Sequence, residues 1–301
     1  MKKIVGLGAC VLDTLIECEA YPIEDKKSSA NLIVRTGGGP VANALVVASK
    51  MGQKSEFVGA LSDDVDGDFL VSEFKRYGVD TNNVKRINNT NAFVSYIVLS
   101  KETASRTCVF NRGNVPDDFE NINISTLDNA DVLHLDGNYL NSAIKSAEYA
   151  KSKGVMVSLD AGGLYKDIEN LLPYVDILIP SEEFALGITK AKTADEAIRI
   201  LQEKYSPKVL VVTQGANGGL FVAGEKICKY DSFKVKCVDS NGAGDTFHGA
   251  FLVAYLNGLS IDKCCEFASA TSAIKCTKVG MRDALPTYNE VLDFVNSKVK
   301  T

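Results

Sequence analysis

The sequence predicts an α/β protein with a mostly parallel main sheet and a second, smaller sheet. Short β-branched and apolar runs alternate with longer amphipathic stretches over most of the chain, which is typical of parallel strands joined by crossover helices. Two regions before residue 112 break this alternation, because their extended segments are not followed by helical ones. From residue 243 onward the pattern is helical only.

The elements of the main sheet follow from hydrophobic periodicity. Strands are expected at 3–8, 56–60, 132–135, 155–159, 177–179 and 209–213, followed by a meander over 219–236. Helices are expected at 40–51, 65–77, 142–153, 194–205, 243–257, 260–277 and 287–298. The chain has no internal repeat, linker or low-complexity segment, so we expect one domain over residues 1–301.

The two irregular regions, about 11–35 and 91–111, each contain two extended segments. These segments lie at 11–20, 30–35, 92–100 and 106–111. Four strands inserted into an α/β chain predict a small extra sheet. Such a sheet beside the main core is expected to form a lid over a site.

Composition excludes several classes of protein. The chain has 301 residues, 46% of them hydrophobic and 24% charged, which is an ordinary globular composition. Its net charge of −5 argues against binding to a nucleic-acid backbone. No run reaches the ~18 apolar residues of a membrane helix, and the glycine-rich segment after Lys3 is too short for a signal peptide. We therefore expect a cytoplasmic protein without nucleic-acid or membrane partners.

Cysteine and histidine usage narrows the chemistry. The eight cysteines are scattered without a C-x-x-C pair, which indicates buried apolar thiols rather than a zinc or disulfide framework. The only histidines are His134 and His248, too few for most histidine metal sites. Chemistry in this chain is therefore expected to use carboxylates, glycines and backbone groups.

The strongest motif is the sequence DSNGAGDTFHGAF at 239–251. Gly242 and Gly244 permit a tight turn, and a helical pattern follows at once. Free N–H groups at a helix N-terminus form an anion site. Asp245 lies in the first turn, where a carboxylate can accept a proton from an attacking hydroxyl while the N–H groups hold phosphoryl charge. The alternative from spacing alone is that Asp245 only caps the helix.

A second glycine-rich motif, TGGGPVANAL, occupies residues 36–45. Its three glycines precede Pro40 at the first position of a predicted helix, which indicates a turn of close backbone approach. Asn43 lies one turn into that helix and can face the same cleft, or it can be a solvated side chain. No P-loop, complete dinucleotide fingerprint or protein-kinase motif set is present.

Together, GGPVANA and DSNGAGDTFHGAF resemble the two signature motifs of the ribokinase-like (PfkB) carbohydrate kinases. Their order, their separation and the chain length match, and the resemblance covers essentially the whole sequence. It implies a ribokinase-like three-layer fold with a β-sheet lid. It also implies ATP as phosphoryl donor, Mg²⁺ and K⁺ as cofactors, and a homodimer formed through the lid sheets.

The resemblance also implies roles for individual residues. Asp245 matches the catalytic base, and Gly242, Ala243 and Gly244 match the anion hole. Residues matching the sugar site are Asp13, Gly38, Gly39 and Asn43. Residues matching the nucleotide site are Thr213, Gly215 and Gly218, together with Gly242 and Gly244. Asp239 and Asn241, with the loop 277–283, match a site for a monovalent cation.

The chain departs from the family pattern at three places. Where members carry N-x-x-E, whose Glu organises Mg²⁺ through water, this chain has SEEF at 181–184, so Glu182 and Glu183 are both candidates. Val11 and Pro40 replace the Asn and Lys of ribokinases proper, which argues against ribose. Arg112 resembles an Arg of fructokinases and 2-keto-3-deoxygluconate kinases and can pair with a substrate carboxylate or phosphate. The alternative for Arg112 is a solvated lid residue.

The function expected from these residues is ATP-dependent phosphorylation of a primary hydroxyl on a sugar or sugar-like substrate. The pattern favours a fructokinase or 2-keto-3-deoxygluconate kinase type over a ribose kinase. One alternative is a nucleoside kinase, for which Phe93, Tyr96 and Phe110 on the lid would supply a base-binding wall. Another is a catalytically silent sugar-binding module, although mere binding needs no base at an anion hole.

Overall fold

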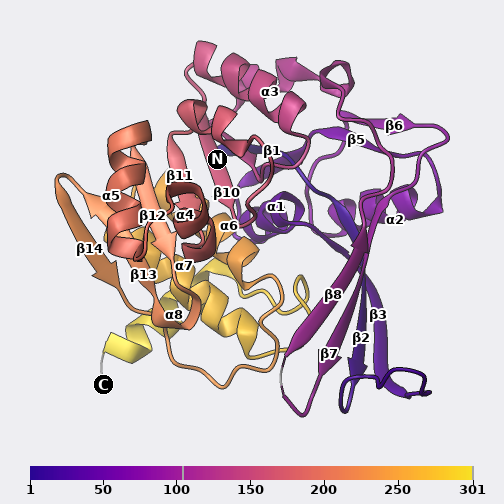
Figure 1. Cartoon of the computed structure of the whole chain (residues 1–301). Helices are drawn as coiled ribbons and strands as arrows, with labels where there is room; N and C mark the ends of the chain where they lie inside the picture. Colours follow the sequence, from indigo (N-terminus) through magenta and orange to yellow (C-terminus); the bar gives the residue numbers. More distant parts are fainter. Residues whose placement is uncertain (104, 300–301) are drawn as a thin grey trace.

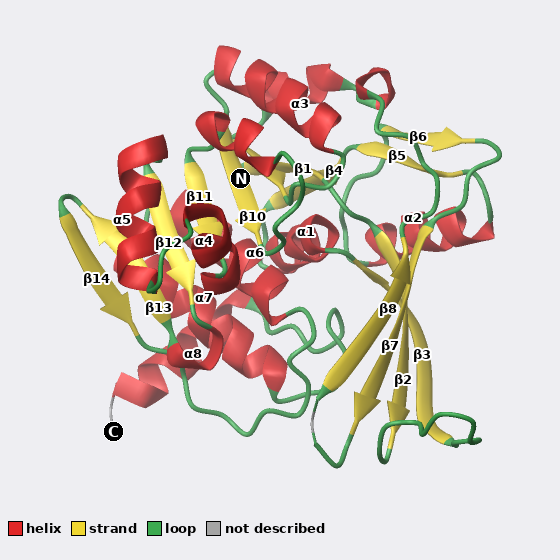
Figure 2. Ribbon diagram, viewed as in Figure 1, coloured by secondary structure: helices red, strands yellow, loops and turns green. Residues whose placement is uncertain are grey.

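The computed structural model describes residues 1–103 and 105–299, and its main sheet has eight strands (Figures 1 and 2). Their order is β14-β13-β12-β11-β10-β9-β1-β4. The strands are β1 (Lys3–Leu7), β4 (Lys54–Phe57), β9 (Val132–Leu135), β10 (Met156–Ala161), β11 (Ile177–Pro180), β12 (Val209–Thr213), β13 (Gly219–Ala223) and β14 (Lys226–Tyr230). Neighbours from β12 to β4 are parallel, and β13 and β14 add an antiparallel edge.

Helices cover both faces of this sheet (Figure 2). One face packs on α3 (Leu140–Ser152), α4 (Glu182–Thr189) and α5 (Ala194–Tyr205). The other packs on α1 (Pro40–Lys50), α2 (Val65–Arg76), α6 (Ala243–Leu256), α7 (Ile261–Cys276) and α8 (Tyr288–Val299). Successive strand residues alternate between the layers: Val132 joins one apolar cluster and Leu133 the other. The predicted three-layer α/β fold is confirmed.

The expected second sheet is also present, with strand order β3-β2-β7-β8. Its members are β2 (Val11–Cys18), β3 (Ala30–Gly38), β7 (Phe93–Ser100) and β8 (Arg106–Asn111). The β2–β7 pair is parallel and the outer pairs are antiparallel. Figure 1 shows this sheet projecting from the main body. Leu15, Ile97 and Leu99 form its apolar cluster, against which Val279 of the C-terminal region packs.

The prediction for 56–60 was wrong in one respect. The segment is two strands, because Gly59 adopts a φ of 135° that ends β4. The following β5 (Gly59–Ser62) pairs in parallel with β6 (Val84–Ile87) as a separate two-stranded sheet. The meander also ends at Tyr230, before the predicted residue 236. Within 1–103 and 105–299, no helix is long and apolar enough to cross a membrane.

Candidate active site

The first glycine motif is the junction between β3 and α1. Gly39 has a φ of 98°, and a side chain there would overlap the carbonyl oxygen of Ala9, so the position requires glycine. A side chain at Gly38 would overlap the carboxylate of Asp13. Gly38 therefore allows the Asp13 carboxylate on β2 to lie directly against the backbone that precedes α1, and Gly39 allows the chain after β1 to approach the same backbone.

The second motif is the N-terminus of α6. Gly242 precedes the helix with a φ of 70°, and the Ala243 N–H donates to the Ser240 carbonyl oxygen at 3.2 Å. The Gly244 N–H has no acceptor within hydrogen-bond distance in the described ranges, and Gly244 is exposed. An open N–H at the positive end of a helix attracts an anion. Asp245 follows in the same turn.

A side-chain hydrogen bond joins the two motifs, although 202 residues separate its partners along the chain. The Asn43 side-chain amide donates from Nδ2 to Oδ2 of Asp245 at 2.7 Å. Asn43 in turn accepts at Oδ1 from Nε of Arg282, at 3.1 Å. Asn43 is 4% exposed and Arg282 is 1% exposed, so this orientation is fixed by buried partners. The buried Asn43–Arg282 pair thus holds one carboxylate oxygen of Asp245 in place.

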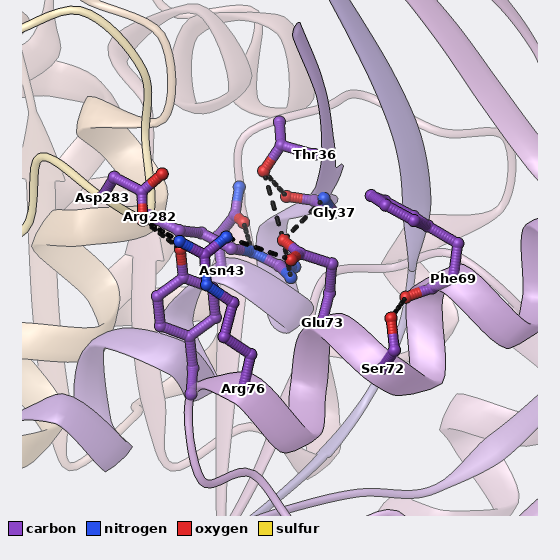
Figure 3. A network of polar contacts seen from close by, with 10 residues as sticks. Thr36, Gly37, Asn43, Phe69, Ser72, Glu73, Arg76, Arg282 and Asp283 are labelled. Carbon is purple, nitrogen blue, oxygen red and sulfur yellow. Dashed lines mark hydrogen bonds and ion pairs between the residues drawn. The ribbon is translucent and has the colours of Figure 1, made fainter.

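Arg282 is held by a network that sequence reasoning missed (Figure 3). Its Nη1 lies 3.7 Å from Oε2 of Glu73 on α2. The same Glu73 oxygen accepts from the Gly37 N–H at 3.2 Å and from the Thr36 hydroxyl at 3.4 Å. The sequence does contain a signal for Glu73, because this charged residue lies on the apolar face of its helix together with Leu70 and Phe74. No comparable signal marks Arg282.

Both carboxylates in the cleft hold protons more tightly than usual. Burial raises the pKa of Asp13 to about 6, against the opposing effects of the Ser95 hydroxyl at 2.6 Å and of Arg282. Burial also raises the pKa of Asp245, and the nearby Asp160 carboxylate raises it further. A more basic carboxylate is a better proton acceptor, which suits Asp245 to the role of general base.

Two further buried carboxylates lie at the ends of β9 and β10, and neither was predicted. Asp136 accepts from the Ala9 N–H at 2.8 Å, which fixes the turn after β1. Asp160 forms a 3.2 Å contact with Nε2 of His248, which lies one turn after Asp245 on α6. Although burial raises the pKa of Asp160, His248 lowers it overall. The structure therefore places His248 between Asp160 and the turn of α6 that carries Asp245.

Arg112 is an exposed cation without an acidic partner at this point of the lid. Its Nη1 donates to Oδ1 of Asn138 at 2.5 Å. Its guanidinium lies 5.5, 5.8 and 5.4 Å from the ring centres of Phe93, Phe110 and Tyr165. Among the residues that the structure describes, no carboxylate lies within 4.0 Å of it. The aromatic rings orient the guanidinium and leave its charge available to a ligand.

A cavity of about 420 Å³ adjoins the other side of the α6 N-terminus. Thr213 ends β12 beside it, and Gly215 and Gly218 turn the chain with φ of 57° and 79°. The cavity is lined by the predicted residues Thr213, Gly215, Gly218, Ala243 and Gly244, and by the apolar rings of Tyr230, Phe233 and Phe247. Aromatic walls beside a helix N-terminus fit a planar base with phosphates.

The candidate residues for Mg²⁺ and for a monovalent cation differ in burial and in hydrogen-bond partners. Glu182 accepts at Oε1 from the Gln214 side chain at 2.7 Å, next to Thr213, whereas Glu183 is exposed. Asp239 is 1% exposed, and its Oδ1 accepts from the Asn241 N–H at 2.8 Å. Its carbonyl oxygen accepts from Nζ of Lys275 at 2.8 Å. Burial lowers the pKa of Lys275, and the Asp239 carboxylate opposes this effect.

Comparison with known proteins decides the family. The model of the pfkB family of carbohydrate kinases matches residues 1–288. This chain belongs to that family. Its relatives include ribokinases, fructokinases and 5-dehydro-2-deoxygluconokinases, so it is a sugar kinase. A ribokinase of Haemophilus influenzae is 27% identical, with 98% of each chain covered.

Solved structures agree with this assignment. The ribokinase of Arabidopsis thaliana complexed with ribose and ATP has a TM-score of 0.84 at 26% identity, covering 98% of this chain and 99% of the other. An Escherichia coli protein of this fold, solved with ATP and Mg²⁺, has a TM-score of 0.87 at 19% identity, covering 99% and 100%. That similarity shows the fold alone. The kinase chain spans 57% of a bifunctional ribokinase/ribose-5-phosphate isomerase A from Fructilactobacillus sanfranciscensis.

Proposed function

We propose that this kinase transfers the terminal phosphoryl group of ATP to a primary hydroxyl of an anionic sugar or sugar acid. The observation that carries the proposal is the 2.7 Å contact between Asn43 and Asp245. In this proposal the Asp245 carboxylate lies between a sugar site at Asp13 and the nucleotide cavity lined by Thr213 and Gly244. The acceptor hydroxyl and the phosphate chain would therefore meet at Asp245.

In this mechanism each residue has one task. Asp13 accepts hydrogen bonds from sugar hydroxyls and orients the substrate. Asp245 takes the proton of the attacking hydroxyl. The hydroxyl oxygen forms the new bond to phosphorus as the bond from phosphorus to the leaving oxygen of ADP breaks. The N–H of Gly244 and the dipole of α6 stabilise the charge on the transferred group. Positioning and electrostatics supply most of the rate in phosphoryl transfer.

ATP would occupy the cavity beside the α6 N-terminus, with its base between the aromatic side chains. Mg²⁺, when bound, neutralises phosphate charge. It usually keeps several waters and uses only one or two protein carboxylates, which fits the described residues, where no group of three metal-ligating side chains occurs. Glu182 is the better placed candidate to hold a water of Mg²⁺, because it contacts Gln214 at the nucleotide side. Glu183 points to solvent.

The anionic substrate class follows from Arg112. An oriented guanidinium without a protein carboxylate fits a carboxylate or phosphate of the substrate, which it can bind with two parallel hydrogen bonds. The same contacts weigh against the nucleoside alternative, because Phe93 and Phe110 already pack against the Arg112 guanidinium. A phosphofructokinase would need more cations at this place.

The assembly and its surroundings are also proposals. The small sheet exposes Leu32, Ile33, Tyr96 and Val109. Apolar strands at the edge of a sheet are stabilised by pairing, so we expect a homodimer through the lid sheets. A cytoplasmic location stays a prediction from the sequence.

The proposal is tested by a substrate panel in an assay coupled to ADP formation. Sugar acids such as 2-keto-3-deoxygluconate are expected to be better substrates than fructose, ribose or nucleosides. Arg112→Gln should raise KM for sugar acids by about 10-fold or more, since a bidentate charged contact is lost, and should leave neutral sugars unchanged. Lys226→Gln, on the distant β14, is the matched control. Higher kcat/KM for a nucleoside than for every sugar would refute the assignment.

A further inference from the structure

The buried lysine on α7 lies where the family resemblance predicts a free monovalent cation. Lys275 is 0% exposed, and its Nζ donates to the Asp239 carbonyl oxygen at 2.8 Å. The same Nζ lies 3.7 Å from Oδ2 of Asp239. The carboxylate oxygens also accept from backbone, Oδ1 from Asn241 and Oδ2 from Gly280 at 2.9 Å. A buried ammonium beside both the carbonyl and the carboxylate of Asp239 already supplies the single positive charge that potassium would bring, so the residues present do not fit a second monovalent cation there.

We propose that the Lys275 ammonium is the built-in cation of this loop and makes the kinase independent of potassium. An ammonium group carries the single positive charge of a potassium ion and offers three N–H groups to oxygen ligands. Because it is covalently attached to the chain, no ion has to be bound from solution. The inference deepens the proposed kinase function, on which its kinetic test depends.

The position of Lys275 connects it to the phosphoryl site. Asp239 begins the turn that leads to Gly242 and the open N–H of Gly244. The same helix is bound to that turn at two more points: Ser272 donates to the Ala243 carbonyl oxygen at 2.9 Å, and the Cys276 carbonyl oxygen accepts from the Asp239 N–H at 3.2 Å. A fixed charge at Lys275 therefore holds the turn whose amide faces the transferred phosphoryl group.

The alternative is that the Lys275 ammonium has a structural role only and does no more than neutralise the buried Asp239 carboxylate. The two roles differ in what removal of the ammonium does. Removing it leaves the Asp239 carboxylate and carbonyl without a cation in a buried space. If Lys275 replaces a cation, a free potassium or ammonium ion should fill that space and restore the turn. If it does not, no monovalent ion should have a specific effect.

The test compares wild type with Lys275→Ala and Lys275→Met in potassium, ammonium, sodium and tetramethylammonium chloride at equal ionic strength. Wild-type kcat should agree within about twofold across the salts. Lys275→Ala should lose about 10-fold or more in kcat in tetramethylammonium and recover most of it in potassium or ammonium. Lys263→Met, a change of an exposed lysine on the same helix, should behave as wild type.

Thermal unfolding gives a readout that does not depend on kinase activity. Potassium should raise the Tm of Lys275→Ala relative to tetramethylammonium, by the linkage of ion binding to folding, and should leave the wild-type Tm unchanged. Potassium activation of the wild type by more than about fivefold would overturn the inference. So would a folded Lys275→Ala or Lys275→Met whose kcat and Tm ignore potassium. If no sugar is phosphorylated, the Tm comparison still decides, and only the proposed function fails.

Discussion

The substitution Asp245→Asn separates catalysis from folding at this site. The Asp245 carboxylate accepts at Oδ2 from the Asn43 amide at 2.7 Å. An Asn at 245 can accept the same bond through its own Oδ1, so the contact between the two motifs is kept. Its second atom becomes an NH₂ group that cannot accept the substrate proton. Burial already disfavours the charged form of Asp245, so a neutral amide should not lower the stability at neutral pH.

The loss is therefore expected in kcat alone. A positioned general base contributes about 10²–10⁴ in rate, and kcat should fall by at least that lower factor. Affinity for sugar and ATP should change little, which is the signature of an interaction made in the transition state. Initial rates and isothermal titration measure the two effects. Asp262→Asn, another acidic residue in the first turn of a helix, is the matched control.

Turnover of the Asp245→Asn protein within about threefold of wild type would refute the reasoning. Asn caps helices about as well as Asp, so a capping residue would tolerate the change. A fall in kcat accompanied by a large fall in Tm would also argue against a purely chemical role for Asp245. Equal Tm with lost turnover is the combination that the geometry predicts.

Three further outcomes follow from the same contacts. Because the pKa of Asp13 is raised to about 6, the stability that its proton contributes is lost as pH rises through 6; Asp13→Asn should therefore be more stable than wild type near pH 7, by up to ~3 kcal/mol, with no gain near pH 4. Urea unfolding at both values checks this, and a pH-independent difference would contradict it. Glu73→Gln leaves Arg282 buried without its countercharge and should cost ~3 kcal/mol of unfolding free energy; a cost under about 1 kcal/mol would show that the pair is not needed. Sugar alone should protect the amides of β7 and β8 from hydrogen exchange, since Asp13 belongs to the sheet that closes; equal protection by ATP alone would refute a sugar-driven lid.

Most of the fold was predictable because its signals are local. The alternation of strands and helices and the glycine turns before Pro40 and Ala243 depend on neighbouring residues only. The split at Gly59 was not predictable, since an apolar run of that length fits one strand as well as two. Which strands pair across the lid depends on contacts far apart in the chain.

Site residues were predictable where they belong to a glycine motif. They were not predictable where they contact the motif from another segment of the chain. Asn43 and Asp245 sit in motifs, and they meet. Arg282 and Lys275 lie in segments of ordinary composition, and only the fold brings them to Asn43 and Asp239. A buried charge leaves little trace in a sequence, because its partner is set by tertiary packing. The stronger signal was Glu73, a charge on an apolar helix face.

Sugar binding and the strength of the base are linked through the charges that the two motifs bury together. Asp245 and Asp13 are near enough that the first raises the pKa of the second, and such coupling acts equally in both directions. Hydroxyls that donate to Asp13 stabilise its ionised form. A second negative charge in the cleft then raises the proton affinity of Asp245 when the acceptor is in place. Arg282 limits the effect, because it lowers the pKa of Asp13 and holds the Asn43 that orients Asp245. The buried arginine therefore opposes the rise in the pKa of Asp13 and, through Asn43, fixes the position of Asp245.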